Sequence, residues 1–439
     1  MPLLSDYTKT LEPSAIRLAG KVFSERFDKD SIRAYNVAIG NVSLPSFEVM
    51  GTELIPIFDE EGNVIKERRV VKYTDTSGTE EAKDAFRHII GLNGVDVKDK
   101  YAIITSTGSS SGMMYTELLT GGMVNEIDRS IMGFAPLYAN YMQFADMFKI
   151  KIAAINRILE QNGKFTMPSE QEIERFIKEH NPNALILIPN DNPTGSHITQ
   201  EQINQIAMTA VKYDIWLIED AAYRGMCYTG HSVSSIWNIS ENQIPGITGR
   251  RISLESFSKY LNYCGGRAGA MFTDSKEFYD AFYAAQTALL CASTEMQEEI
   301  AKLQNVSKSS FDAWLANLNN YYKRMMESFV TDIRKELSGV IISNPDAALY
   351  SVVDVRKIAK PGFNAKDFVL YCAGKGAIVY NENDIKTALV APMAGFYSNE
   401  EGKTLGKTQM RIAYVLWPEE MIKVPRLFAD LFKEFEANR

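Results

Sequence analysis

The chain has 439 residues and a formal charge of −8, from 47 basic and 55 acidic side chains. Its 45% hydrophobic and 23% charged content is typical of an ordinary globular protein, and the length is sufficient for two domains with a large core. The acidic balance argues against a general binder of nucleic acid or of anionic membranes, although it allows a local basic pocket for a small anion.

Targeting and metal-binding patterns are absent from the sequence. No apolar stretch approaches the ~18 residues that a membrane-spanning helix needs, and the N-terminal residues MPLLSDYTKTLEPS lack the pattern of a secretory signal. The four cysteines and four histidines show no ligand spacing, so we expect no metal site. A reducing cytoplasm fits this cysteine usage best.

The first part of the chain predicts an arm, a hairpin and a helix. Residues 1–45 are interpreted as an arm that packs with the C-terminal domain and carries one short helix capped by Ser14. Residues 55–70 predict a β-hairpin around Gly62, which we interpret as an insertion. Thr79, followed by two glutamates, predicts the start of an amphipathic helix.

From about residue 100 the pattern becomes that of an α/β protein. Short apolar runs predict buried strands at residues 101–105, 130–134, 184–189, 215–218, 251–254 and 270–272. Helical patterns lie between several of them, most clearly at residues 199–214. This alternation predicts a mostly parallel sheet covered by helices in a large domain over residues 46–304, with ligands beyond the carboxyl ends of the strands.

The last part of the chain predicts a smaller α+β domain over residues 305–439. One long helix is expected around residues 311–329, and strands are expected at residues 340–342, 349–353, 377–379 and 411–416. Residues 397–407 are interpreted as a polar loop. The apolar stripe of residues 424–435 predicts a terminal helix packed on the core.

One lysine lies in a pattern with an obvious chemical use. Lys259 follows an apolar run and enters a glycine-rich turn, with Ser256 and Ser258 beside it and Arg267 eight residues later. Such an amine can form a Schiff base with an aldehyde while the serines and the arginine hold a phosphate, which describes pyridoxal phosphate. Taken alone, a solvated surface lysine is the commoner outcome.

Two further segments could contact the same cofactor. Residues 103–112 predict a strand, a loop and a helix, so that the N–H groups of Gly108, Ser109 and Ser110 could bind phosphate at the helix N-terminus. A plain serine-rich turn is the alternative. Tyr138, in PLYANY, could lie over a flat heteroaromatic ring or pack in the core.

Three more polar residues follow predicted strands. Asn192 lies in the rigid turn PNDNPTG after an apolar run, and Asp220 ends the run IWLIED, three residues before Tyr223. A carboxylate there can pair with a protonated pyridine nitrogen, and the amide and phenol can reach a ring oxygen. For Asp220 alone, a helix N-cap is the alternative. The sequence GKTLGKT at residues 402–408 departs from P-loop spacing, and we reject that interpretation.

Together these motifs resemble a known family. The order TSTGSSSG, PLYANY, DNPTG, EDAAY, SFSK, GGRAG and QMRIAY, spread over roughly residues 14–435, resembles the class I and II aminotransferases of the fold type I pyridoxal phosphate enzymes. The resemblance implies an α/β fold with a large domain built on a mostly parallel sheet and a smaller C-terminal α+β domain. It also implies a homodimer with shared active sites.

The resemblance assigns roles residue by residue. It makes Lys259 the Schiff-base lysine and proton carrier, Asp220 the partner of the pyridine nitrogen, and Arg411 the clamp for the substrate α-carboxylate. The other implied contacts are Tyr223 and Asn192 to the ring oxygen, Tyr138 stacked on the ring, Gly108, Ser109, Ser110, Ser256, Ser258 and Arg267 to the phosphate, Gly40 to the substrate, and Tyr73 to the phosphate of the neighbouring subunit.

The expected activity is transfer of an amino group between an α-amino acid and a 2-oxo acid by a ping-pong mechanism. A β-eliminating C–S lyase or another Cα lyase on the same scaffold is the alternative, and a regulatory module that binds pyridoxal phosphate without turnover is a third. The hairpin around Gly62 and the loop at residues 397–407 are longer than the family minimum. No clear second arginine is found for a distal carboxylate, and Arg17 and Arg224 are its candidates.

Overall fold

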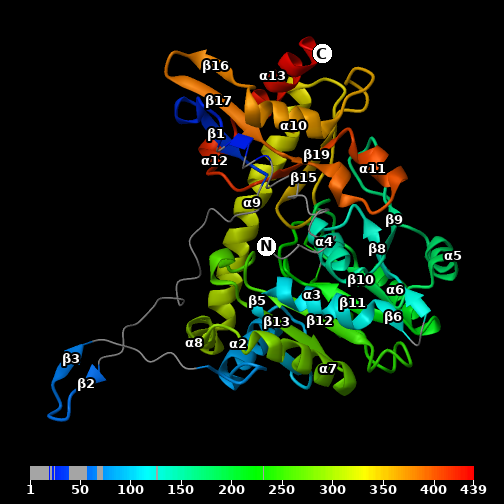
Figure 1. Ribbon diagram of the computed structural model, residues 1–439, viewed down its shortest axis with the longest axis vertical. Helices are drawn as coiled ribbons and strands as arrows, with labels where there is room; N and C mark the ends of the chain where they lie inside the picture. The colour runs from blue at the N-terminus through cyan, green and yellow to red at the C-terminus, as the bar shows by residue number, and fades with distance from the viewer. Residues whose placement is uncertain are drawn as a thin grey trace, which may run out of the picture.

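The structure is a computed structural model, which describes residues 19, 22–23, 25–38, 57–66, 73–124, 127–230 and 232–439. Figure 1 shows a lower lobe built around a central sheet and an upper lobe, with the long helix α9 (Lys308–Glu336) running from one towards the other. Of the helix expected after Ser14, residues 15–18 lie outside the described residues, Arg17 among them, whereas Ala19, Val22 and Phe23 are helical; Gly40 also lies outside the described residues.

The described part of the lower lobe contains a seven-stranded sheet in the order β4-β13-β12-β11-β10-β8-β9. All neighbours pair in parallel except β13, which is antiparallel to both β12 and β4. The strands are β4 (Tyr101–Ile104), β8 (Ile131–Ala135), β9 (Ile152–Asn156), β10 (Ala184–Leu187), β11 (Trp216–Asp220), β12 (Arg251–Ser256) and β13 (Gly269–Thr273). The mostly parallel sheet expected from the sequence is confirmed.

Helices cover both faces of this sheet because successive strand residues point in opposite directions. Ile103 and Met271 belong to one apolar cluster with residues of α3, α4 and α7, whereas Ile104 and Phe272 belong to another cluster with residues of α2, α5, α6 and α8. The helices are α2 (Glu80–Leu92), α3 (Ser109–Thr120), α4 (Ala139–Phe148), α5 (Glu170–His180), α6 (Gln200–Lys212), α7 (Lys276–Gln286) and α8 (Thr294–Ala301). Thr79 caps α2, as expected: its side chain accepts from the N–H of Ala82.

Two small sheets build the upper lobe. One has the order β14-β15-β19-β18 and the other β1-β17-β16, in the described residues. Their strands are β1 (Arg33–Asn36), β14 (Ile341–Ile342), β15 (Tyr350–Asp354), β16 (Ile378–Asn381), β17 (Asp384–Leu389), β18 (Ala391–Pro392) and β19 (Gln409–Ala413). β1 pairs in parallel with β17, so this part of the N-terminal segment lies against the upper lobe.

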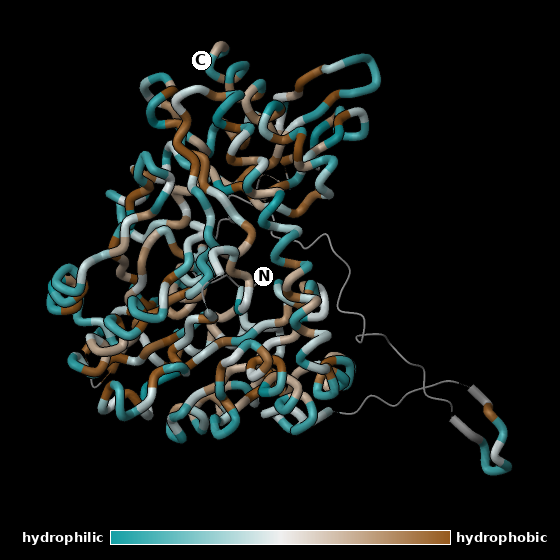
Figure 2. Tube along the Cα trace, turned by 180° about the vertical axis from the view of Figure 1, so that it is seen from behind, coloured by the Kyte–Doolittle hydropathy of each residue, from teal (hydrophilic) through white to brown (hydrophobic). Residues whose placement is uncertain are grey.

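The remaining elements are short hairpins and helices. The predicted hairpin around Gly62 is confirmed as β2 (Ile57–Phe58) paired with β3 (Val64–Lys66), and β5 (Ser106–Gly108), β6 (Gly122–Val124) and β7 (Ile127–Arg129) are also short. The other helices are α10 (Ala365–Gly374), α11 (Glu400–Gly406), α12 (Pro418–Met421) and α13 (Val424–Ala437). Figure 2 shows apolar segments inside both lobes and polar turns at their margins.

The structure corrects the sequence interpretation of secondary structure. Residues 397–407 are not a loop throughout, because α11 lies within them, capped by the Asn399 side chain and carrying Glu400 and Glu401 in its first turn. Among the strands that were not predicted are β9 in the large sheet and β17 in the upper lobe. β9 is one of the two edge strands of its sheet and is mostly half-buried, so its sequence is less continuously apolar than that of the central strands.

The large sheet uses residues 101–273 and the two upper sheets use residues 33–36 and 341–413. We keep the boundary at residue 305 between the two domains as a proposal that agrees with this division. Among the described helices, none combines the length and the apolar character that crossing a bilayer requires.

Candidate active site

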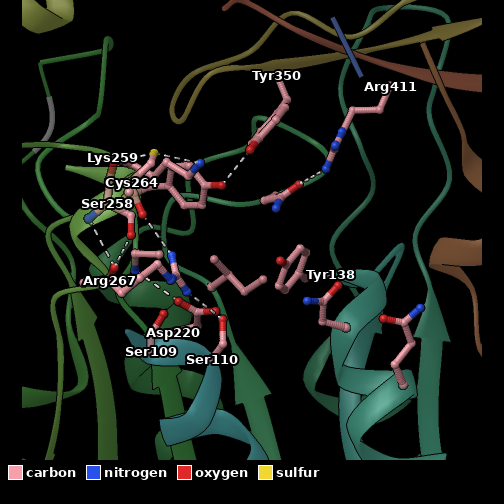
Figure 3. Close-up of a pocket in the computed structure, with 18 of the residues that line it drawn as sticks. Ser109, Ser110, Tyr138, Asp220, Ser258, Lys259, Cys264, Arg267, Tyr350 and Arg411 are labelled. Carbon is pink, nitrogen blue, oxygen red and sulfur yellow. Dashed lines mark hydrogen bonds between the residues drawn. The ribbon is translucent and has the colours of Figure 1, made fainter. Parts of the chain in front are cut away.

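A cavity of about 610 Å³ lies where the two lobes meet, at the carboxyl ends of β11 and β12. Among the residues expected from the sequence, its wall contains Ser109, Ser110, Tyr138, Asn192, Asp220, Tyr223, Ser256, Ser258, Lys259, Arg267 and Arg411. Figure 3 shows Arg411 and Tyr350 on one side of this space and Ser109, Ser110 and Arg267 on the other. The wall also includes Asn140, Gln143, Cys264 and Tyr350, which were not expected from the sequence.

Lys259 lies in the turn that follows β12, half-buried at the cavity. Its Nζ is 3.5 Å from the Sγ of Cys264, and that thiol donates to the carbonyl oxygen of Ser258 at 2.8 Å. Phe257 anchors the turn from behind, because its ring stacks on Phe86 of α2 with centroids 4.0 Å apart. The lysine is therefore held on a packed turn with its amine directed to the cavity, and Figure 3 shows it beside Cys264.

The segment before α3 and the turn after β12 together form a concave group of donors. Gly108 is the N-cap of α3 with a φ of 66°, and the Nη2 of Arg267 donates to the Thr107 carbonyl at 2.8 Å and to Ser110 Oγ at 3.4 Å. A Cβ on Gly269 would come within 2.4 Å of Ser109 N, so only glycine allows β13 to pack this closely. N–H groups of a helix start, an arginine and serine hydroxyls are the donors that a phosphate requires.

Asp220 ends β11 and presents its carboxyl group to the cavity. Its Oδ2 accepts from the Tyr141 hydroxyl at 2.5 Å, and its Oδ1 accepts from the Ala222 N–H at 3.1 Å. Burial raises the pKa of this carboxyl, and the hydrogen bond from Tyr141 opposes that rise. A buried carboxylate of this kind is stabilised most by a cationic group placed beside it. Tyr141 was missed in the sequence, although PLYANY contains it.

Arg411 projects from β19 and is 3% exposed. Its Nη1 donates to Asn192 Oδ1 at 2.8 Å and its Nη2 to the Ala38 carbonyl at 2.7 Å, whereas its buried Nε has no hydrogen-bond partner among the described residues. Buried guanidinium groups with unused donors are well suited to bind a carboxylate. The side-chain oxygen of Asn192 accepts the hydrogen bond from Arg411, so its amide nitrogen remains to donate to a bound cofactor.

Tyr138 and Tyr223 are the two aromatic residues expected at the cofactor. Tyr138 is half-buried before α4, with its ring 5.5 Å from the Tyr141 ring in an edge-to-face arrangement, and burial raises its pKa to about 12. Tyr223 is 5% exposed and its hydroxyl lies 2.8 Å from that of Tyr350. Both phenols are therefore protonated at neutral pH and can donate hydrogen bonds.

Two of the expected residues that the structure describes do not line the cavity of this chain. Gly108 is not among the residues that line the cavity, but it directly precedes Ser109, which does line it. Tyr73 is 80% exposed, and its contact with the phosphate of a neighbouring subunit stays a prediction. Gly40 is outside the described residues, and so is Arg17.

Arg224 is not available to a substrate, so its interpretation as a candidate for a distal carboxylate is wrong. Its guanidinium is buried between two carboxylates, 2.6 Å from Glu219 and 2.6 Å from Glu255. The residue is 3% exposed, and Glu219 also accepts from Ser235 Oγ at 2.8 Å. The sequence could not show this pairing because Glu255 lies on the neighbouring strand β12.

We expect Arg224→Met to lower the free energy of unfolding by about 3–5 kcal/mol, because it leaves two buried carboxylates without their cation. Denaturant unfolding measures this loss. Arg250→Met is the matched control, since the partner of Arg250, Asp214, has a side chain that is 93% exposed, and a loss below about 1 kcal/mol is expected there. Equal losses for the two variants would contradict a structural role specific to Arg224.

Comparisons with known proteins identify the family to which the chain is similar. The profile of the family described as aminotransferase class I and II matches residues 50–383, which is more than half of the chain. An inactive alanine aminotransferase from Saccharomyces cerevisiae is 25% identical over 266 residues, which cover 56% of this chain and 51% of that protein. A 1-aminocyclopropane-1-carboxylate synthase from Arabidopsis thaliana is 22% identical over 299 residues, which cover 67% of this chain and 63% of that protein. The chain thus spans less than two thirds of the length of these curated relatives.

A solved structure shows the same fold. The aspartate aminotransferase from Thermus thermophilus with maleate superposes with a TM-score of 0.75 at 16% identity, covering 98% of this chain and 100% of that one. Class I and II aminotransferases depend on pyridoxal phosphate, and the donors beside α3, the lysine on its packed turn and the buried Asp220 fit that cofactor. The fold, the cavity and the profile match agree, and the chain belongs to the class I and II aminotransferase family.

Proposed function

We propose that the protein is an aminotransferase that moves an amino group between an α-amino acid and a 2-oxo acid by a ping-pong mechanism. The observation that carries this proposal is the position of Lys259, Asp220 and Arg411 around one cavity. An amine, a carboxylate and a guanidinium are the three groups that this chemistry requires at the cofactor aldehyde, the pyridine nitrogen and the substrate carboxylate.

Bound in this cavity, pyridoxal phosphate supplies an electron sink for the substrate Cα. The proposal gives Lys259 two tasks: it holds the cofactor covalently and, once the substrate amine replaces it, carries the proton from Cα to the cofactor. Asp220 keeps the ring nitrogen protonated, and Tyr138 lies on the ring. Tyr223 and the Asn192 amide bind the ring oxygen, and the phosphate is held by Gly108, Ser109, Ser110, Ser256, Ser258 and Arg267.

The proposal also includes an oligomeric state, a cellular compartment and a substrate contact. Tyr73 is exposed, as a side chain that reaches a second subunit must be in a single chain, so we include a homodimer with shared sites. All four cysteines are free thiols, which supports a reducing compartment such as the cytoplasm. We also place Gly40 at the substrate, as the family resemblance implies.

A Cα lyase, for example a β-eliminating C–S lyase, is the second candidate. It is favoured by the relative named a synthase rather than an aminotransferase, and it needs the same lysine, aspartate and carboxylate-binding arginine. The relative named inactive supports the third candidate, a module that binds the cofactor without turnover. The intact Lys259 argues for chemistry over the third candidate.

A half-reaction separates the three. The purified protein is loaded with pyridoxal phosphate, and a panel of amino acids is added without any 2-oxo acid. Conversion of the lysine-bound absorbance band to that of pyridoxamine phosphate, with one equivalent of 2-oxo acid released, is the expected result. A persistent band with ammonia and 2-oxo acid accumulating from donors that carry a β leaving group would instead establish the lyase. A persistent band with no product would support the third candidate, a module that binds the cofactor without turnover.

Arg411 provides a test of substrate recognition. We expect Arg411→Gln to lower kcat/KM for the amino acid donor by about 10- to 100-fold, because a charge-assisted hydrogen-bond pair is lost. The corresponding primary amine, which lacks the carboxylate, should react with wild type and variant at similar rates. Measuring kcat/KM for both donors checks this. An equal loss for acid and amine would mean that Arg411 is structural and does not bind the carboxylate.

A further inference from the structure

Tyr350 joins the two sides of the cavity. It begins β15 in the upper lobe, is 2% exposed and faces the same space as Lys259. Its hydroxyl lies 2.8 Å from the hydroxyl of Tyr223, which follows β11 in the lower lobe, and the two rings meet edge-to-face at 5.8 Å. Figure 3 shows Tyr350 between Arg411 and Lys259, with its hydroxyl directed into the cavity.

The face of the same ring contacts the carboxylate-binding arginine. The Cζ of Arg411 is 4.5 Å from the centroid of the Tyr350 ring, and on another side it is 5.2 Å from the Phe396 ring. β15 and β19 pair antiparallel, with Tyr350 opposite Ala413 and Val352 opposite Arg411. The sheet therefore holds the tyrosine and the arginine as near neighbours, and the desolvated cation–π contact restricts where the guanidinium can lie.

We propose that Tyr350 is a positioning residue with two separable parts: its hydroxyl orients the phenol of Tyr223 towards the cofactor, and its ring orients Arg411 towards the substrate carboxylate. This role deepens the proposed aminotransferase function and rests on it. Tyr350 acts through Tyr223 and Arg411, and the two parts are tested by removing the hydroxyl and the ring in turn.

The role of the Tyr350 hydroxyl follows from the number of protons that the two phenols can donate. A phenol has one proton to donate and lone pairs that accept. Tyr223 can give its proton to the ring oxygen of the cofactor only if Tyr350 donates to Tyr223 and does not accept from it. The chain of donors then runs from Tyr350 to Tyr223 to the ring oxygen, and each bond strengthens the next. The Arg411 guanidinium contacts the ring of Tyr350, which favours this direction because a neighbouring cation makes a phenol a better donor.

The expected effect can be read from the absorbance of the lysine-bound cofactor without turnover. The two hydrogen bonds, from Tyr350 to Tyr223 and from Tyr223 to the ring oxygen, stabilise negative charge on that oxygen. Without them, the ring oxygen shares the proton of the neighbouring nitrogen that joins the cofactor to Lys259. Loss of these hydrogen bonds favours the protonated form of the lysine-bound cofactor. We therefore expect Tyr350→Phe to raise the midpoint of the pH titration of the lysine-bound absorbance band by about 0.3–0.6 pH units. Because Phe keeps the ring over Arg411, the KM for the amino acid donor should stay within about twofold.

Tyr350→Leu removes both parts. We expect the same rise in the absorbance midpoint together with a KM increased about tenfold, because the cation–π contact is lost as well. Tyr223→Phe should raise the midpoint at least as much as Tyr350→Phe, and the double variant should add nothing further, since both act on one chain of hydrogen bonds. Tyr414→Phe is the matched control: this tyrosine is also buried in the upper lobe, but its hydroxyl lies 2.6 Å from Ser351 Oγ and not at the cavity.

The outcomes distinguish the inference from the function. If wild type forms the lysine-bound band and completes the half-reaction while Tyr350→Phe leaves the midpoint unchanged, or Tyr414→Phe raises it equally, the role of Tyr350 is refuted and the aminotransferase proposal stands. Additive shifts in the double variant would also refute it. If wild type forms no lysine-bound band, the proposed function fails and this role of Tyr350 fails with it. A raised midpoint with an unchanged KM in Tyr350→Phe, and both changes in Tyr350→Leu, support the inference.

Discussion

Lys259→Ala is expected to lower the rate of the half-reaction by at least about 10³-fold, because it removes both the covalent attachment and the proton carrier. Pyridoxal phosphate should still bind through the donors beside α3, but without the lysine-bound absorbance band. Borohydride reduction of the loaded wild type, followed by mass spectrometry of its peptides, should place the reduced cofactor on the peptide that contains Lys259. The variant should give no labelled peptide.

Lys276→Ala is the matched control for this change. Lys276 is an exposed lysine at the start of α7 and pairs with Asp280, so its loss should leave the absorbance band and the rate unchanged. Label on a peptide other than that of Lys259, or a Lys259→Ala protein that retains the half-reaction rate, would contradict the role of this lysine. An inactive variant that unfolds at a much lower temperature than wild type would need Lys259→Arg as a second test.

Asp220→Asn is expected to have the second largest effect. The variant keeps the shape of the side chain but cannot balance a positive charge on the ring nitrogen in this buried position. Removing one partner of a buried ion pair costs about 3–5 kcal/mol, and the lower of these energies already slows the half-reaction by about 10²-fold. Stopped-flow absorbance of the cofactor measures the rate, and the lysine-bound band should still form, since Lys259 is intact.

Tyr141→Phe gives a graded comparison for Asp220. It leaves the carboxylate in place and removes the hydrogen bond of 2.5 Å from the phenol, so a loss of about tenfold is expected. Burial already raises the pKa of Asp220 and Tyr141 opposes that rise. The variant should therefore raise the pKa of Asp220 further and move the acidic limb of the rate profile to higher pH. A loss in Tyr141→Phe larger than that in Asp220→Asn would show that Tyr141 acts by itself.

The local elements were predictable because their signals are local. The short apolar runs marked six of the seven strands in the large sheet, since a strand buried on both faces needs a continuous apolar segment. Capping residues such as Thr79 marked where a helix begins. Edge strand β9 and helix α11 were missed, because a half-buried strand has a weaker pattern and a short helix held by one cap resembles a polar loop.

The sequence by itself determined the kind of chemistry: a lysine in a glycine-rich turn, a carboxylate at a strand end and an arginine in a late strand, in the order of a known family. Only the tertiary structure decided which side chains meet. Arg411 and Asn192 are 219 residues apart, Tyr223 and Tyr350 are 127 apart, and Tyr141 and Asp220 are 79 apart. Periodicity and capping act over a few residues, whereas these contacts arise from the pairing of strands and the meeting of the two lobes. Arg224 is a further example of a contact that the sequence does not reveal. The packing of β12 beside β11 places Glu255 against Arg224, and this ion pair makes Arg224 unavailable to a substrate.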